Sequence, residues 1–124
     1  MDVPSTWATL SIWEHADRLV SNGRLVIDRP AMARHHKMPE YVYPLDYGYL
    51  AGTTGGDGEG IDVWVGSYSR HEVTAVACTI DPVKENAELK ILWRCTSHEI
   101  AEIEKFYVPQ PQAALVIIRP GVNT

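Results

Sequence analysis

Apolar residues in the first part of the chain recur at the spacing of a helix. Between residues 8 and 20 they return every three or four positions, at Leu10, Trp13, Ala16 (or Asp17 in its place) and Val20. This spacing predicts an amphipathic helix, which Asn22-Gly23 would end as a left-handed cap. The same Asn-Gly pair also fits the type I′ turn of a β-hairpin. We favour the helix because Trp7 and Trp13 fit it better.

Most of the remaining chain carries the shorter apolar runs that predict strands. Continuous or alternating apolar residues bounded by turn residues indicate about six of them, at positions 24–28, 41–50, 61–65, 73–80, 89–93 and 113–118. In the segment 61–65, Ile61, Val63 and Val65 would share one face of a sheet, with Asp62 and Trp64 on the other.

A second helix is predicted to follow residue 96. Thr96-Ser97-His98-Glu99 has the spacing of a capping box. Apolar residues at helical spacing follow it, and Pro109 and Pro111 would end the helix. Strands with a helix near each end of the chain predict a mainly β (α+β) fold, an antiparallel β-barrel with an N-terminal and a C-terminal helix packed outside.

Length and composition favour one domain, residues 1–124, because this length buries a core without disulfides or structural metal. The net charge of −5 argues against nucleic-acid binding, which normally needs a basic surface. Cys78 and Cys95 lie in or beside apolar runs without metal-ligand spacing, so we expect reduced thiols. The chain shows no signal-peptide pattern and no apolar run near the ~20 residues of a membrane span. We therefore expect a cytoplasmic protein without a membrane partner.

Acidic residues concentrate at a glycine-rich turn before the segment 61–65. Asp57, Glu59 and Asp62 fall within six positions, and carboxylates this close repel one another unless a cation lies between them. Asp81 ends one predicted strand and Glu88 begins the next, so neighbouring strands would bring all five carboxylates to one mouth of the barrel. An all-oxygen set of ligands favours Mg2+ or Mn2+ over zinc.

Basic and phenolic side chains predict a phosphate-containing substrate for this site. Lys90 would share a strand face with Glu88, as expected of a lysine that holds a phosphate bridging protein and metal. Further candidates are three cations and two phenols: Arg29, Arg34, Lys37, Tyr43 and Tyr47. We interpret the adjacent His35 and His36 as loop residues rather than metal ligands. This combination predicts metal-assisted phosphoryl transfer with direct attack by water, because no Ser/His/Asp or Cys/His pattern appears.

The segment YPLDYGYLAGT followed by DGEGIDVWV resembles the signature region of the soluble, Mg-dependent inorganic pyrophosphatases. The family's pattern is a YP..YGY segment followed by D-G-D-P-x-D-V. The resemblance implies that Asp57 and Asp62 hold metals. Glu59 stands where the family has the aspartate that activates the attacking water, and Gly60 replaces the proline that follows it.

A second acidic group extends the resemblance. Asp81 and the triplet Glu88-Leu89-Lys90 resemble the family's aspartate followed by Asp-x-Lys. This match implies that Asp81 and Glu88 are metal ligands and that Lys90 contacts phosphate. Tyr47 matches the family's phosphate-contacting tyrosine, and Tyr43 matches the ring before the proline.

Two alignments are open upstream of this region. Placed on the family's early I-E-I-P strand, VIDRP makes Asp28 the glutamate, and Lys37 and Glu40 stand in for a Lys-x-Glu pair. Placed on a later strand, the same segment makes Arg29 the arginine that binds phosphate. We prefer the first alignment because the chain is much shorter than a typical member.

The resemblance covers roughly residues 24–93 and implies an OB-like barrel, Mg2+ (or Mn2+) as cofactor, and hydrolysis of inorganic diphosphate to two phosphates. One alternative is a hydrolase of another phosphoanhydride, such as a nucleotide. Another is a catalytically silent member that binds phosphate compounds or a partner, although unpaired clustered carboxylates are costly for a scaffold. Four tryptophans are candidate anchors for contacts in a homo-oligomer: Trp7, Trp13, Trp64 and Trp93.

Overall fold

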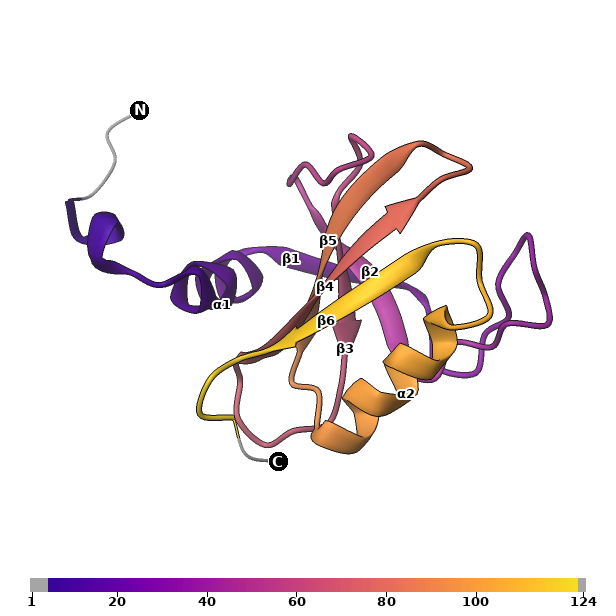
Figure 1. Ribbon diagram of the computed structural model, residues 1–124. Helices are drawn as coiled ribbons and strands as arrows, with labels where there is room; N and C mark the ends of the chain where they lie inside the picture. The colour runs from indigo at the N-terminus through magenta and orange to yellow at the C-terminus, as the bar shows by residue number, and fades with distance from the viewer. Residues whose placement is uncertain (1–4, 123–124) are drawn as a thin grey trace.

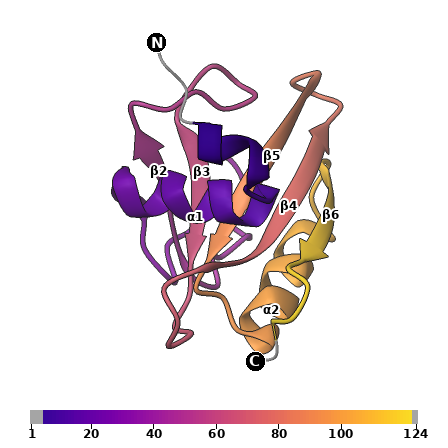
Figure 2. The same cartoon turned by 90° about the vertical axis from the view of Figure 1, so that its left-hand side faces the viewer.

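The computed structural model describes residues 5–122, which form six β-strands, two α-helices and a short 3₁₀ helix, η1. In chain order these are η1 (Ser5–Thr9), α1 (Ile12–Asn22), β1 (Arg24–Arg29), β2 (Asp46–Ala51), β3 (Ile61–Val65), β4 (Val73–Asp81), β5 (Asn86–Trp93), α2 (Ser97–Tyr107) and β6 (Ala113–Ile118). The strands form one sheet in the order β1-β2-β3-β5-β4-β6. The two helices lie on opposite faces of the sheet, as Figures 1 and 2 show from two directions.

The sheet contains one parallel pair. β3 and β5 run in parallel, with Val63 opposite Ile91, whereas the other neighbouring strands are antiparallel. β5 follows β4 in an antiparallel hairpin and lies between β3 and β4, so it runs against β4 and in the direction of β3. The mainly β fold with a helix near each end is confirmed. The strands predicted to form an antiparallel barrel form one mixed sheet that is not closed across residues 5–122, with β1 and β6 at its edges.

Each face of the sheet has its own hydrophobic core, because one helix covers each face. On the first face, Ala16 and Val20 of α1 pack against apolar residues of four strands: Leu50, Val63, Val73, Val76 and Ile91. On the second face, residues of α2 pack against the sheet around Trp64: Ile100, Ile103, Tyr107, Leu92 and Ala77. Successive side chains of a strand point to opposite faces. Strand β3 therefore gives Val63 to the α1 face and both Asp62 and Trp64 to the α2 face.

Both helices begin at a capping box. At α2, Glu99 N donates to Thr96 Oγ1 at 3.2 Å and Thr96 N donates to Glu99 Oε1 at 2.8 Å, so this prediction is confirmed. Ser11 and Glu14 form the same pair of hydrogen bonds, so α1 begins at residue 12 rather than near residue 8. The left-handed cap predicted after it is wrong, because Gly23 has φ −88° and leads directly into β1. A glycine is still needed there, since a Cβ would lie 2.5 Å from the Leu19 carbonyl oxygen.

The segment 41–50 is only partly a strand. Strand β2 begins at Asp46, and the preceding residues fold back on the loop after β1. There Tyr43 N donates to the Ala33 carbonyl at 2.9 Å and Met32 N donates to the Tyr43 carbonyl at 2.8 Å. A single bridge joins Arg34 to Val42. These contacts fix the loop 30–45 at one end of the sheet, beside the C-terminal end of α2.

Three further expectations are tested by the structure. Cys78 and Cys95 are both free thiols, as predicted; Cys95 is buried and Cys78 is partly buried. Trp64 is not available as an anchor for a second copy, because its side chain is wholly enclosed by the core of the α2 face. No helix in the described part of the chain is both long and apolar enough to cross a membrane.

Candidate functional site

A cavity of about 640 Å3 opens on the α2 face of the sheet. Its walls come from β3, the β4–β5 hairpin, the loops on either side of β2, and the end of α2. Ten of the residues predicted to form the site line this one cavity: Arg29, Lys37, Tyr43, Tyr47, Asp57, Glu59, Asp62, Asp81, Glu88 and Lys90. Arg34 is not among the lining residues, and its guanidinium donates to the Pro39 carbonyl instead. The roles of the ten residues remain predictions.

Lys90 connects three strands at the centre of this cavity. Its ammonium donates to Tyr47 Oη at 2.9 Å, to Asp62 Oδ2 at 2.9 Å and to Glu88 Oε2 at 3.3 Å. An ammonium has three donors, so these partners use all of them. The lysine side chain is only 6% exposed, and the Asp62 and Glu88 side chains are 22% and 14% exposed. The group is therefore a largely buried ion cluster.

The parallel pairing of β3 with β5 creates this cluster. Since Val63 lies opposite Ile91, the preceding residues Asp62 and Lys90 project side by side from the α2 face. Glu88 reaches the same face because it precedes Lys90 by two positions on β5. Tyr47 arrives from β2, where it pairs with Trp64.

The acids and the lysine affect one another's protonation. Burial raises the pKa of Glu88, and the negative charges of Asp62 and Asp57 raise it further, against the opposing effect of Lys90. Burial by itself would lower the pKa of Lys90, but its neighbours, chiefly Tyr107 and Asp62, outweigh burial and raise it. Lys90 is therefore a fixed positive charge at physiological pH.

Aromatic side chains form the floor of the cavity. The rings of Tyr43, Tyr47 and Phe106 all contact Trp64, at centroid distances of 5.7, 4.7 and 5.4 Å. The Trp64 indole N–H donates to Tyr107 Oη at 3.2 Å. Burial raises the pKa of Tyr107 to about 12 and that of Tyr47 well above 10. These phenols are neutral hydrogen-bonding groups at physiological pH.

Two of the predicted acids also hold the turns on which they lie. Asp57 Oδ1 accepts from Glu59 N at 2.9 Å. Asp81 Oδ1 accepts from Val83 N at 2.9 Å and from Lys84 N at 3.1 Å. One carboxylate oxygen of each acid is used in this way. The glycine turn lies directly against β5, since a Cβ on Gly56 would be 2.1 Å from the Ala87 carbonyl oxygen, and this contact brings Asp57 toward Glu88.

The residues match Mg2+ in chemistry but are not gathered into a ready ligand group. Among residues 5–122, no three His, Cys, Asp or Glu side chains are grouped so as to hold a metal ion. The Lys90 ammonium lies between Asp62 and Glu88 instead. The four predicted ligands that share the cavity offer only oxygen donors, which is the donor type of Mg2+. By donor chemistry, therefore, the residues fit the predicted cation.

Other lining residues were not assigned to the site from the sequence. They include a lysine, two histidines and residues of the C-terminal end of α2: Lys84, His35, His36, Phe106, Tyr107 and Gln110. The histidines were interpreted as loop residues, and they do lie in the loop after β1. Tyr107 and Phe106 belong to the apolar residues at helical spacing that predicted α2, and this spacing gives no indication of a site. One sequence feature could have assigned Lys84 to the site, namely its position three residues after the predicted ligand Asp81.

Comparison with known proteins gives a fold likeness of limited extent. No family model matches the chain, and no curated protein matches it. Two similar solved structures are an inorganic pyrophosphatase from Helicobacter pylori, at 16% identity, and an inorganic phosphatase from Anaplasma phagocytophilum, at 17% identity. In each case the match covers 76% of this chain and 81% of the other chain, with a TM-score of 0.49. A likeness of this extent does not establish a family for the chain.

Proposed function

We propose that the protein hydrolyses inorganic diphosphate to two phosphates with Mg2+, by direct attack of water. The observation that supports this function is the composition of one cavity. It gathers carboxylates suited to a hard cation beside lysine, arginine and tyrosine side chains suited to phosphate oxygens. Water forms the new P–O bond, the bond from that phosphorus to the bridging oxygen breaks, and phosphate leaves.

The cationic and phenolic residues would bind the diphosphate. Lys90 is buried and its three donors are used within the cluster, so it would attract the phosphates through its charge rather than by a further hydrogen bond. Tyr47 and Tyr43 would offer neutral hydroxyl groups from the floor of the cavity. Arg29 and Lys37 line the same cavity from another part of the chain, the end of β1 and the loop that follows. Diphosphate would then meet positive charge from more than one segment.

Four carboxylates would hold Mg2+: Asp57, Asp62, Asp81 and Glu88. When bound, the cation would neutralise charge on the phosphate oxygens and lower the pKa of water. Glu59 is the group we assign to accept the proton of the attacking water. Its side chain lies on the exposed glycine turn, and it forms no ion pair among the described residues. Asp62 would position that water from β3 while its Oδ2 contacts Lys90.

The test is phosphate release from diphosphate, measured with and without Mg2+. We expect turnover that chelation abolishes and added Mg2+ restores. The substitution Glu59→Gln should lower kcat by about 100-fold or more, because a positioned general base contributes about 10²–10⁴-fold. Asp62→Asn should cause a loss at least as large, since it changes both a predicted ligand and a partner of Lys90.

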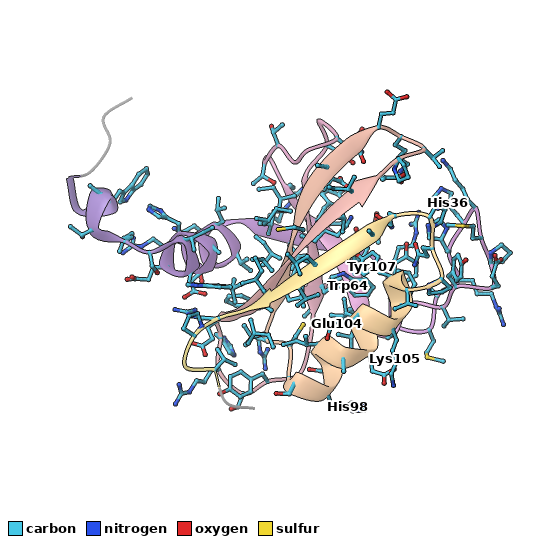
Figure 3. The ribbon with its side chains drawn as sticks, viewed as in Figure 1. His36, Trp64, His98, Glu104, Lys105 and Tyr107 are labelled. Atoms are coloured by element: carbon cyan, nitrogen blue, oxygen red, sulfur yellow. The ribbon has the colours of Figure 1, made fainter. Side chains whose placement is uncertain are left out.

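Glu104→Gln is the matched control. Glu104 is an exposed carboxylate of α2 and does not line the cavity, and Figure 3 shows it on that helix. This variant should keep the wild-type kcat. Absence of turnover on diphosphate under all metal conditions would overturn the proposed function. Unchanged activity of Asp62→Asn would overturn the site assignment.

A further inference from the structure

A stack of aromatic rings lines the cavity, and the proposed function uses only one of its members, through the hydroxyl of Tyr43. The rings of His36 and His35 are stacked at a centroid distance of 5.1 Å and an angle of 10°. His35 is parallel to Tyr43 at 6.1 Å and 1°, and Tyr43 contacts Phe106 at 4.9 Å. His36 is the outermost ring and is exposed. Its outer face therefore offers a planar surface at the cavity.

Hydrogen bonds fix the inner part of this stack. His35 Nδ1 accepts from Lys37 N at 3.2 Å and from Met38 N at 3.3 Å. The loop is joined to the end of α2 by a hydrogen bond from Tyr41 Oη to the Pro109 carbonyl at 2.9 Å. The planar surface is thus built on a fixed support. Figure 3 shows His36 on the same side of the sheet as Tyr107 and Trp64.

The cavity is also larger and less polar than diphosphate requires. Its volume of about 640 Å3 lies within the ~300–1,000 Å3 of pockets that hold drug-sized organic ligands. Met38, Val83 and Phe106 contribute apolar surface to its lining. Two phosphoryl groups would contact only the charged part and leave this surface without a partner.

The cations extend beyond the centre of the cavity in the same way. Lys37 and Lys84 line the cavity in addition to Lys90, and neither forms an ion pair with another described residue. They stand on two different walls, one in the loop after β1 and one in the β4–β5 turn. Positive charge is therefore available along a phosphate chain that continues away from Lys90.

We propose that the cavity binds a nucleoside polyphosphate, with its base stacked on His36 and its phosphate chain among Lys37, Lys84 and Lys90. A nucleobase is planar and stacks on aromatic rings without needing a specific hydrogen-bond pattern. Its polyphosphate carries the same phosphoanhydride bond as diphosphate. This inference rests on the proposed function for the phosphate end of the site and adds a subsite for an organic group.

The test compares two hydrolysis-resistant probes by isothermal titration calorimetry in one buffer that contains Mg2+. Methylenediphosphonate represents the phosphate end alone, and adenosine α,β-methylene diphosphate adds the nucleoside. We expect the nucleotide probe to bind at least about fivefold more tightly, because stacking of one base on a ring is worth about 1–3 kcal/mol. Equal affinities of the two probes would overturn the inference.

Variants of His36 test the position of the base. His36→Ala should remove most of the preference for the nucleotide probe, since it removes the outermost ring and the next ring centroid, that of His35, lies 5.1 Å away. His36→Phe keeps a ring and should retain the preference. His98→Ala is the control, because this exposed histidine lies at the other end of α2 (Figure 3) and outside the cavity. A preference that survives His36→Ala would also overturn the inference.

The outcomes separate this inference from the proposed function. If diphosphate is hydrolysed but the two probes bind equally, the base subsite is wrong and the proposed function stands. If the nucleotide probe binds more tightly and depends on His36 while diphosphate is not hydrolysed, the proposed function is wrong and the subsite stands.

Discussion

Replacing Lys90 with methionine removes the positive charge between Asp62 and Glu88 and keeps an apolar stem of similar length. The lysine side chain is 6% exposed and contacts both carboxylates, at 2.9 and 3.3 Å. Removing one partner of a buried ion pair costs about 3–5 kcal/mol, because the remaining charge is left without a partner. The side chains of Asp62 and Glu88 keep 22% and 14% exposure, so water can solvate them partly. We therefore expect a loss near the lower end, about 3 kcal/mol.

The measurement is urea unfolding at pH 7, with thermal unfolding as a second readout. For a chain of this length, a loss of about 3 kcal/mol lowers Tm by roughly 10 °C. Lys105→Met is the matched control, because the Lys105 side chain is 74% exposed and its pair with Glu102 is 3.4 Å long. Exposed pairs of this kind contribute about 0–1 kcal/mol. Equal losses in the two variants would refute the buried-cluster explanation.

The pH dependence gives a second check on the same variant. Glu88 already has a raised pKa in the folded protein, and Lys90 is the neighbour that opposes this rise. Without Lys90 the pKa of Glu88 in the folded protein rises further above its ordinary value of 4.5. The free energy of unfolding of the variant therefore falls as pH increases from 4.5 through this raised pKa. The stability difference from wild type should therefore be larger at pH 8 than at pH 5. Adding Glu88→Gln should recover part of the loss, and a double variant as unstable as the sum of both single losses would contradict direct coupling.

Two further predictions concern the sheet and the start of α2. Glu99→Gln should lower stability by about 1 kcal/mol at pH 7 in urea unfolding, because the carboxylate caps the helix at Thr96 and also accepts from Ser67 N and Oγ. Although burial raises the pKa of Glu99, hydrogen bonds from Thr96 and Ser67 outweigh it and lower the pKa. The contribution is thus present above pH 4.5 and disappears as pH falls through the lowered value, and a constant difference down to pH 2 would contradict it. Gly48→Ala should cost about 3 kcal/mol or more in the same assay, because its Cβ would lie 1.9 Å from the Val26 carbonyl oxygen. Gly52→Ala is the control, because a Cβ at Gly52 meets no atom within 4 Å and only its positive φ of 81° opposes the substitution. If Gly48→Ala lowers stability no more than Gly52→Ala does, the close approach of Gly48 to Val26 is contradicted.

Local parts of the fold follow directly from neighbouring residues. The capping box at Thr96 predicts the start of α2, because both of its hydrogen bonds lie within four residues. The segments 61–65 and 113–118 were predicted with the bounds that the structure shows, since alternation or an apolar run identifies them without reference to the rest of the chain. The start of α1 was placed too early because apolar spacing continues into the 3₁₀ helix η1. The Ser11–Glu14 capping box was the local signal that could have corrected it.

The order of strands depends on contacts between distant residues, and periodicity carries no information about it. The prediction that Lys90 shares a face with Glu88 needed only the two-residue repeat of one strand. The contact between Lys90 and Asp62 joins residues 28 positions apart and exists because β5 inserts beside β3. The loop position of Tyr43 is non-local as well, since its backbone partners, Met32 and Ala33, precede β2.

The acidic residues show what a charge pattern determines. Their density predicted a cation between the carboxylates, on the ground that they would otherwise repel one another. The repulsion is present, because Asp62 and Asp57 both raise the pKa of Glu88. The cation between Asp62 and Glu88 in the folded chain is the ammonium of Lys90. A cluster of acidic residues in the sequence thus indicates that a positive charge is needed between them. Only the fold determines whether a basic side chain of the same chain lies there. Since Lys90 shares Asp62 and Glu88 with the predicted metal, the same two carboxylates would connect stability to metal binding, and the methionine variant would alter both.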